Sequence, residues 1–335
     1  MATGQSWFSN ELGKYLSNDT LSRKLRAFAQ PQFRWRQFVE KDTQFGKRSG
    51  QKLLFDKRSN LSHTGSDGAL LAENEPIPRD RFGILQGEVI ARESGRGIGW
   101  SELFEQFSEF ETRDPISSAL GDHMARSLDY RAYTAFNTGK VVYTPTGSDT
   151  APTFYWAVAG SAGASASRDA QVLDLKNIAD AMKEGTYGSG TAPTGNNSAP
   201  VPFWDGANYV AIGSVSYNRA IKDDPAWEYA QFYGDPEKHF SGETGRIYGV
   251  RNVEDNHISR RINGYGGEFT VLGADAVMEI VVTGEEIREA LPADFDRDKA
   301  MAWYYLGGFG LIWTYGATSG ETTEYENRIV RVRSA

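Results

Sequence analysis

The spacing of apolar residues predicts one long helix over residues 114–138. An apolar residue recurs at every fourth position, which places one stripe along one side of a helix: Ile116, Leu120, Met124 and Leu128. A helix of this length is a rod of about 36 Å. A polar stretch precedes the rod and a mixed body follows it, which is typical of a building block rather than of an enzyme with a pocket.

The ends and the opposite side of the predicted helix fit the same interpretation. Asp114 is a suitable N-cap, and Gly139 is suited to a left-handed end. Asp122, Arg126 and Asp129 fall on the side away from the apolar stripe, and the first two are spaced to form an ion pair. We therefore expect a polar side on this helix.

The segment 43–100 predicts an extended arm. Short apolar runs at 52–55 and 88–91 predict two strands, joined by a long polar connection with few apolar anchors. An isolated two-stranded hairpin is marginally stable in water, and its free edges invite pairing. We expect the arm to be ordered on a neighbouring subunit, with a surface loop folded on its own body as the alternative. The glycine-rich sequence at 94–100 predicts a bend where the arm meets the body.

The sequence after the long helix predicts an α+β body. The residues after the long helix alternate between strand-like runs and short helices, and no internal repeat is present. The clearest helix covers 173–184 and is stopped by Gly185. The predicted strands cover 140–143, 154–158, 209–212, 245–253, 268–272, 278–282, 303–306, 311–315 and 328–332.

Composition narrows the function classes. No run of 18 apolar residues is present and the N-terminus has no apolar core of a secretory signal, so we expect no contact with a membrane. The chain has no cysteine, which excludes disulfides and thiolate chemistry and suits a reducing cytoplasm.

The net charge of −8 hides an asymmetry between the ends of the chain. Residues 1–60 carry 12 basic and 5 acidic residues, a balance of +7. This leaves 24 of the 36 basic and 39 of the 44 acidic residues for the rest, a balance of −15. A basic arm can bind nucleic acid or the acidic body of a neighbouring copy, and a solvated N-terminal helix is the alternative.

The sequence holds no convincing catalytic, cofactor or metal site. The four histidines are not at ligand spacing, and no hydrolase or phosphate-loop motif is present. Asp294, Asp296 and Asp298 alternate as in a calcium loop, but Lys299 and Tyr305 stand where that loop needs glycine and glutamate. We expect no enzyme. Two other hypotheses are a nucleic-acid-binding protein acting through the basic arm and, from its 8 tryptophans and 16 tyrosines, a carbohydrate-active protein.

The order of these parts resembles the major capsid proteins of tailed bacteriophages, most closely the coat proteins of N-four-type podophages. The likeness covers nearly the whole chain and rests on an ordered set of segments. These are the block RKLRAFAQPQFRWRQF, the arm FDKRSNL…GALLAENEPIP with its glycine bend, the long helix, the segment FSGETGRIYGVRNVEDN, and the final strands. In the fourth segment, Glu243 and Thr244 stand where the corresponding motif of the family begins with apolar residues.

The resemblance implies the Hong Kong 97-like capsid fold and a division of the chain. Residues 1–42 would form the N-arm and 43–100 the E-loop. Residues 101–165, with the spine helix 114–138, would form the P-domain together with the strands of 285–335. Residues 166–284 would form the A-domain.

The resemblance also implies a function and partners. The chain would assemble into pentamers and hexamers of an icosahedral or prolate virion shell, formed in the host bacterial cytoplasm. Portal, scaffolding and decoration proteins would be partners, with packaged double-stranded DNA on the inner face. The expected contacts between subunits come from the two arms: Arg34, Arg36, Leu53, Phe55, Val89 and Ile90. Ile116, Leu120 and Leu128 would pack the spine helix.

Overall fold

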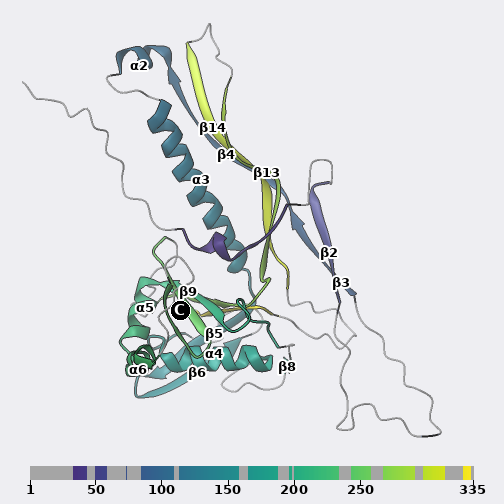
Figure 1. Cartoon of the computed structure of the whole chain (residues 1–335), viewed down its shortest axis with the longest axis vertical. Helices are drawn as coiled ribbons and strands as arrows, with labels where there is room; N and C mark the ends of the chain where they lie inside the picture. The colour runs from purple at the N-terminus through teal and green to yellow at the C-terminus, as the bar shows by residue number, and fades with distance from the viewer. Residues whose placement is uncertain are drawn as a thin grey trace, which may run out of the picture.

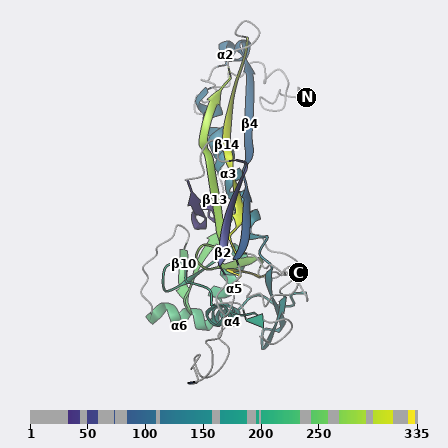
Figure 2. The same ribbon diagram turned by 90° about the vertical axis from the view of Figure 1, so that its right-hand side faces the viewer.

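A long, narrow sheet with one helix along it rises from a compact body in the computed structural model (Figures 1 and 2). The strands of the long sheet run side by side in both views, and helices α4, α5 and α6 belong to the body. The structure describes residues 33–43, 50–58, 73, 84–108, 113–157, 165–187, 196–197, 200–233, 243–257, 267–290, 297–313 and 327–332.

The long sheet has four strands in the order β1-β13-β14-β4. Its strands are β1 (Glu40–Asp42), β13 (Val277–Glu289), β14 (Asp298–Leu311) and β4 (Arg92–Ser101). All neighbours are antiparallel except β1, which runs parallel to β13. The strand predicted at 303–306 lies inside β14, and glycines at 307, 308 and 310 continue its pairing as far as Leu311. The strand predicted at 311–315 is not found as such, because only its first residue lies in β14, 312–313 form no strand, and 314–315 lie outside the described residues.

The long helix is confirmed as α3 (Arg113–Phe136). Its predicted stripe packs on the long sheet, where Leu120 and Leu128 form a buried cluster with Met301, Trp303 and Tyr305. Side chains alternate between the faces of a strand, so the odd-numbered positions of β14 face α3. The apolar stripe of the helix therefore matches one face of one central strand.

Three details of the helix prediction are wrong. Asp114 lies inside the first turn rather than at the N-cap. Gly139 has no positive φ; a Cβ there would make a tight contact with Ile329 Cγ2, at 3.0 Å. Asp129, expected on the polar side, is 1% exposed and accepts hydrogen bonds from the backbone amides of Trp35 and Arg36. The polar side of α3 is thus interrupted where the N-terminal segment crosses it.

The body is built on a seven-stranded mixed sheet in the order β10-β11-β9-β12-β15-β5-β6. The strands, from one edge to the other, are β10 (Glu243–Ile247), β11 (Val250–Asp255), β9 (Tyr209–Ser214), β12 (Phe269–Leu272), β15 (Ile329–Val332), β5 (Val141–Ser148) and β6 (Ala151–Ala157). The helices are α4 (Val172–Glu184), α5 (Val215–Lys222) and α6 (Pro225–Tyr233). The largest buried cluster lies between this sheet and α4, which ends at Gly185 (φ 67°) as predicted.

Two further predictions about strands are corrected. The strand predicted over 245–253 is the hairpin β10–β11, because Tyr248 and Gly249 both have positive φ (49° and 76°) and reverse the chain. The glycines predicted to form a bend lie inside β4 and pair regularly with β14. Gly95 instead allows close packing, because a Cβ there would lie 2.7 Å from the carbonyl oxygen of Trp303.

The sheets do not follow the predicted domain boundaries. β5, β6 and β15, assigned to the P-domain, share the seven-stranded sheet with strands assigned to the A-domain. β13 runs through the boundary placed at 284/285. The division into domains stays a prediction. A division by sheet would place β5, β6 and β15 together with the strands assigned to the A-domain.

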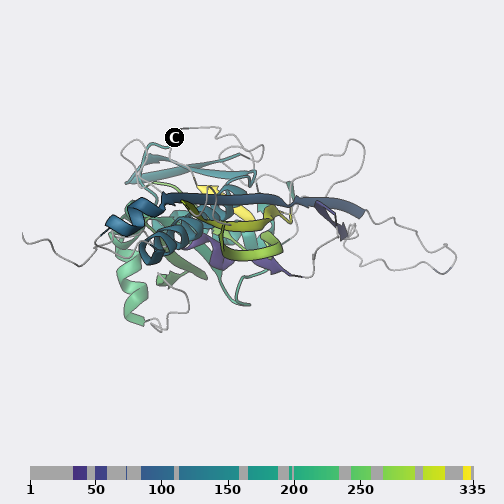
Figure 3. The ribbon, with the colours of Figure 1, turned by 90° about the horizontal axis from the view of Figure 1, so that it is seen from above.

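Four short strands and two short helices complete the described elements. β2 (Lys52–Arg58) and β3 (Ile84–Ile90) form a two-stranded hairpin that stands to the side of the long sheet (Figures 1 and 3). The others are β7 (Thr186–Tyr187), β8 (Asn196–Asn197), the 3₁₀ helix η1 (Trp35–Phe38) and α2 (Glu102–Phe107). The part of the arm between β2 and β3 lies outside the described residues, apart from Glu73.

The carboxylate of Asp205 holds the loop before β9, and the stability that it contributes should depend on pH. Asp205 accepts hydrogen bonds from Arg251 Nε (2.7 Å) and from the amides of Ala207 and Asn208. Partial burial raises the pKa of Asp205, but hydrogen bonds from Asn208, Ala207 and Arg251 outweigh it and lower the pKa to about 2. The ionised carboxylate is therefore part of the folded state at neutral pH.

Because Asp205 is an exposed residue and solvent screens its interactions, we expect it to contribute about 1 kcal/mol of stability. This contribution is complete above about pH 5, where the unfolded carboxyl is ionised, and is lost as the pH falls toward 2. Asp205→Asn removes this contribution at neutral pH and flattens the pH profile in that window. Urea unfolding of both proteins between pH 5 and 2 measures the difference. Parallel profiles for the two proteins would contradict this role.

Candidate assembly surfaces

The arginines expected to reach a neighbour are held by their own chain. Arg34 is buried. Arg36 lies between Glu279, whose carboxylate is 2.6 Å from Nη2, and Glu285, which pairs with Nη1. The hydroxyl of Tyr305 donates to the same Glu279 at 2.8 Å. Because these contacts neutralise its charge, Arg36 fixes the N-terminal segment to β13, and its contact with a neighbour stays a prediction.

The expected contact residues of the arm also pack inside the subunit. Val89 is 1% exposed and forms a small cluster with Ile280 of β13, against which Leu53 and Phe55 are half-buried. Ile90 is half-buried as well. The base of the hairpin therefore lies on its own chain, and contacts of these four residues with another copy stay a prediction.

The opposite side of the hairpin and the tip of the long sheet expose apolar side chains that sequence reasoning missed. On the hairpin, Leu54 is 54% exposed and Ile84 64%. At the tip, Leu103 and Phe104 of α2 are exposed, and Phe107 is 81% exposed (Figure 1). The signal on the hairpin was the alternation in β2, where Leu54 must point away from Leu53 and Phe55.

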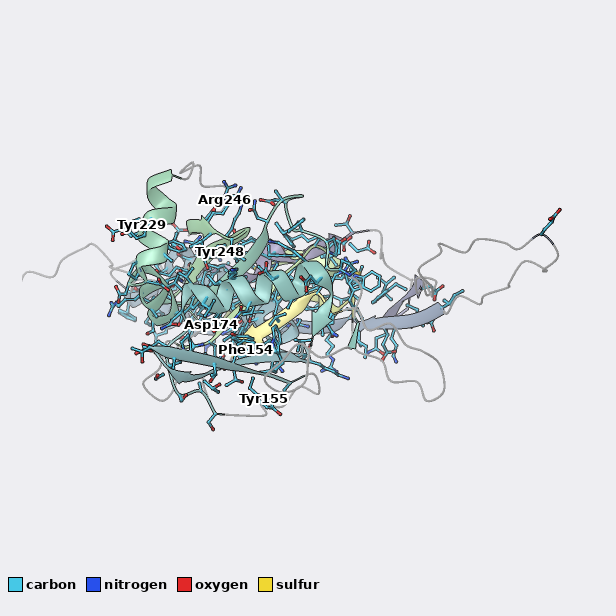
Figure 4. All side chains as sticks on the ribbon, turned by 90° about the horizontal axis from the view of Figure 1, so that it is seen from below. Phe154, Tyr155, Asp174, Tyr229, Arg246 and Tyr248 are labelled. Carbon is cyan, nitrogen blue, oxygen red and sulfur yellow. The ribbon has the colours of Figure 1, made fainter. Side chains whose placement is uncertain are left out.

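The body adds exposed aromatic side chains at its outer rim. Tyr229 of α6 and Tyr248 in the β10–β11 turn are both exposed and lie on the outside of the body in Figure 4. The ammonium group of Lys176 lies 5.9 Å from the ring centre of Tyr248. Large apolar and aromatic groups exposed at several separate places suit a protein with several contact surfaces.

A groove with a volume of about 880 Å³ lies between α3 and the edge strand β4. The helix lines it with a polar stripe at spacings of three and four residues: His123, Arg126, Ser127, Tyr130 and Arg131. The strand contributes four consecutive residues, from Glu93 to Arg96. Sequence reasoning had placed Arg126 on a solvated face and Arg96 in a bend, so neither pattern indicated the groove.

Hydrogen bonds fix the groove wall on the side of the long sheet. Trp303 Nε1 donates to His123 Nδ1 at 3.0 Å. Burial and the positive charges of Arg96 and Arg126 lower the pKa of His123, which keeps the imidazole neutral and able to accept. Arg131 donates to Ser94 Oγ and to the carbonyl oxygen of Gly307. The helix and the strand are thus joined at the floor, while the mouth stays open.

The described residues give no indication of a metal site or a membrane span. No group of three or more histidine, aspartate or glutamate side chains among them is placed to hold a metal ion. Asp294 and Asp296 of the calcium-like alternation lie outside the described residues, and Asp298 begins β14. No described helix is both long and apolar enough to cross a bilayer.

Comparison with known proteins gives matches among solved structures alone. No protein-family model and no curated protein sequence matches the chain. A chain in the head structure of Helicobacter pylori bacteriophage KHP40 has a TM-score of 0.71 at 12% identity, with 98% of each chain covered. The acid-stable capsid structure of H. pylori bacteriophage KHP30 gives 0.69 at 13% identity, covering 98% of this chain and 99% of that one.

A third phage gives a similar result. The capsid of Ralstonia phage GP4 matches with a TM-score of 0.63 at 12% identity, and 94% of each chain is covered. At identities this low, the matches show a likeness of fold. Because nearly all of each chain is covered, that likeness extends over the whole chain. The chain therefore has the fold of these phage capsid chains, which confirms the α+β, Hong Kong 97-like architecture expected from the sequence.

Proposed function

We propose that this chain is the major capsid protein of a tailed bacteriophage, a structural protein that assembles into the head shell. The observation that carries the proposal is the match to phage head and capsid chains over 94–99% of both partners in the three comparisons above. If the two proteins shared only one domain, the match would cover a small part of at least one of the two chains. Here the arm, the long sheet and the body all belong to the match.

The exposed apolar side chains of the subunit support a role in assembly. Apolar side chains are exposed at three distant places, represented by Leu54 on the hairpin, Phe107 at the tip and Tyr229 on the body. Different surfaces that meet head to tail close into rings when the rotation permits, which gives pentamers and hexamers. Burial of these side chains between copies would then stabilise the shell.

The remaining parts of the proposal concern partners and location. Portal, scaffolding and decoration proteins would complete a virion head that is formed in the host cytoplasm. Double-stranded DNA would lie on the inner face. The acidic balance of −15 over residues 61–335 suits a wall that repels phosphate and so holds the genome loosely.

We expect the purified chain to form closed particles. A subunit of 37.1 kDa that assembles into a shell should elute at megadalton size and appear as hollow particles in negative stain. Size-exclusion chromatography with light scattering measures the mass, and the same fractions are imaged. A chain that remains a monomer of 37.1 kDa at every concentration and salt condition tested would count against a shell protein.

A further inference from the structure

The groove between α3 and β4 holds three arginines that form no ion pair within the described part of the chain. Arg96, Arg126 and Arg131 line it, with Glu93 as the one lining carboxylate. None of the three arginines forms an ion pair with a carboxylate of the described residues. Arg126 instead donates to His257 Nε2 at 3.2 Å, and Arg131 donates to a serine hydroxyl and a backbone carbonyl.

The pleat of β4 directs the side chain of Arg96 toward α3 and so into the groove. Arg96 pairs with Trp303 of β14, and Ser94 pairs with Tyr305. Directly paired residues of an antiparallel sheet lie on the same face, and Trp303 and Tyr305 face α3. Glu93 is also a lining residue, and its side chain accepts a hydrogen bond from Tyr304 on the other face of the sheet.

The outer edge of β4 is open to pairing. β4 is the last strand in the order of the long sheet and pairs with β14 on one side alone among the described residues. Ten residues give an edge of about 33 Å, along which backbone N–H and C=O groups alternate. An arginine-lined groove thus lies beside an unpaired strand edge.

We propose that an extended acidic segment of a second copy of this chain lies along the β4 edge, with its carboxylates in the groove against Arg96, Arg126 and Arg131. This inference rests on the proposed function, which brings copies into contact. A carboxylate at every second position of an extended segment would face the groove.

A peptide fits this surface better than a nucleic acid does. Phosphates accept hydrogen bonds and could bind the arginines, but they offer no donors to the free carbonyl groups of the β4 edge. An added strand satisfies both the donors and the acceptors of the edge. The balance of −15 over residues 61–335 makes another copy a ready source of carboxylates.

Charge reversal in the full-length chain tests the role of the groove. We expect Arg96→Glu combined with Arg126→Glu to lower the fraction of protein in particles at least about tenfold, because like charges would then meet across the contact. Both side chains are exposed, so thermal unfolding of the subunit should change little. Replacement of the same two arginines by lysine keeps the charge and should retain most of the assembly.

The matched control is Arg219→Glu, which reverses an exposed arginine on α5, away from the groove. Particle formation equal to wild type in the double glutamate variant would overturn the inference and leave the proposed function intact. Absence of particles with the wild-type chain would instead count against the proposed function.

Cross-linking identifies the occupant. The chain has no cysteine, so Tyr130→Cys, at an exposed groove residue, gives a single attachment point for a maleimide-linked benzophenone. Particles are assembled from this labelled chain and ¹⁵N-labelled wild type, and then irradiated. Cross-links that join ¹⁴N and ¹⁵N peptides, with the ¹⁵N peptide from an acidic stretch, support the inference. Cross-links within one chain alone, or to nucleic acid, would overturn it.

Discussion

Replacing Arg168 with methionine should destabilise the subunit by about 3–5 kcal/mol, because it leaves a buried carboxylate without its counter-charge. The guanidinium of Arg168 donates to both oxygens of Asp174, at 2.6 and 2.7 Å, and the two side chains are 1% and 0% exposed. Asp174 lies in the first turn of α4, at the position labelled in Figure 4. At this depth bulk solvent does not hydrate the carboxylate in place of the lost donor.

The other hydrogen bonds to Asp174 do not make up for the loss of Arg168. Asp174 also accepts from the hydroxyl of Tyr143 at 2.6 Å and from the amide of Gln171 at 2.8 Å. Burial and the charge of Asp174 raise the pKa of Tyr143, so the phenol remains a donor at every accessible pH. Neither donor carries a positive charge, and neither can compensate for Arg168.

Chemical denaturation of the wild type and the variant measures the change in the free energy of unfolding. Lys183→Met is the matched control, since Lys183 pairs with Asp180 at 3.8 Å on the exposed side of the same helix. Such exposed pairs contribute about 0.5 kcal/mol or less. We expect Asp174→Leu in the Arg168→Met background to recover part of the loss, because it removes the unpaired charge. Equal effects of the two single variants would contradict the role of burial.

Local patterns predicted the elements that depend on neighbours in sequence. The spine helix follows from a repeat within 24 residues, and α4 follows from its apolar spacing and Gly185. The predictions failed where the partner is distant in sequence. Asp129 was assigned to a polar face because its partners, Trp35 and His257, are 94 and 128 residues away. No window along the helix contains them.

The candidate surfaces were less predictable than the fold. The arm was recognised as a hairpin, but the side of it that packs on β13 depends on Ile280, which periodicity within the arm cannot reveal. The groove needs Arg96 and Arg126 on two elements that meet only after folding. The overall architecture was available from the resemblance, because the order of segments is a property of the whole chain.

Trp35→Ala should cost about 3–5 kcal/mol and release the N-terminal segment from the long helix. Trp35 is 1% exposed, and its ring lies against those of Tyr133 and Phe136, with centres 5.1 and 5.6 Å away. Its Nε1 donates to Asp255 at 3.1 Å, and its backbone amide donates to Asp129 at 2.9 Å. One residue thus joins the N-terminal segment, α3 and the end of β11.

Two measurements separate local release from general instability. Urea unfolding gives the total loss, and hydrogen exchange of residues 33–43 relative to β9 shows where protection is lost. Trp35→Phe keeps an aromatic ring but loses the bond to Asp255 and the packing of the five-membered ring, so it should cost less than alanine, about 1–3 kcal/mol. If residues 33–43 kept wild-type protection in the alanine variant, Trp35 would not be the anchor of this segment. We expect the opposite, because the remaining bonds of η1 to Asp129 depend on a position that the buried indole holds.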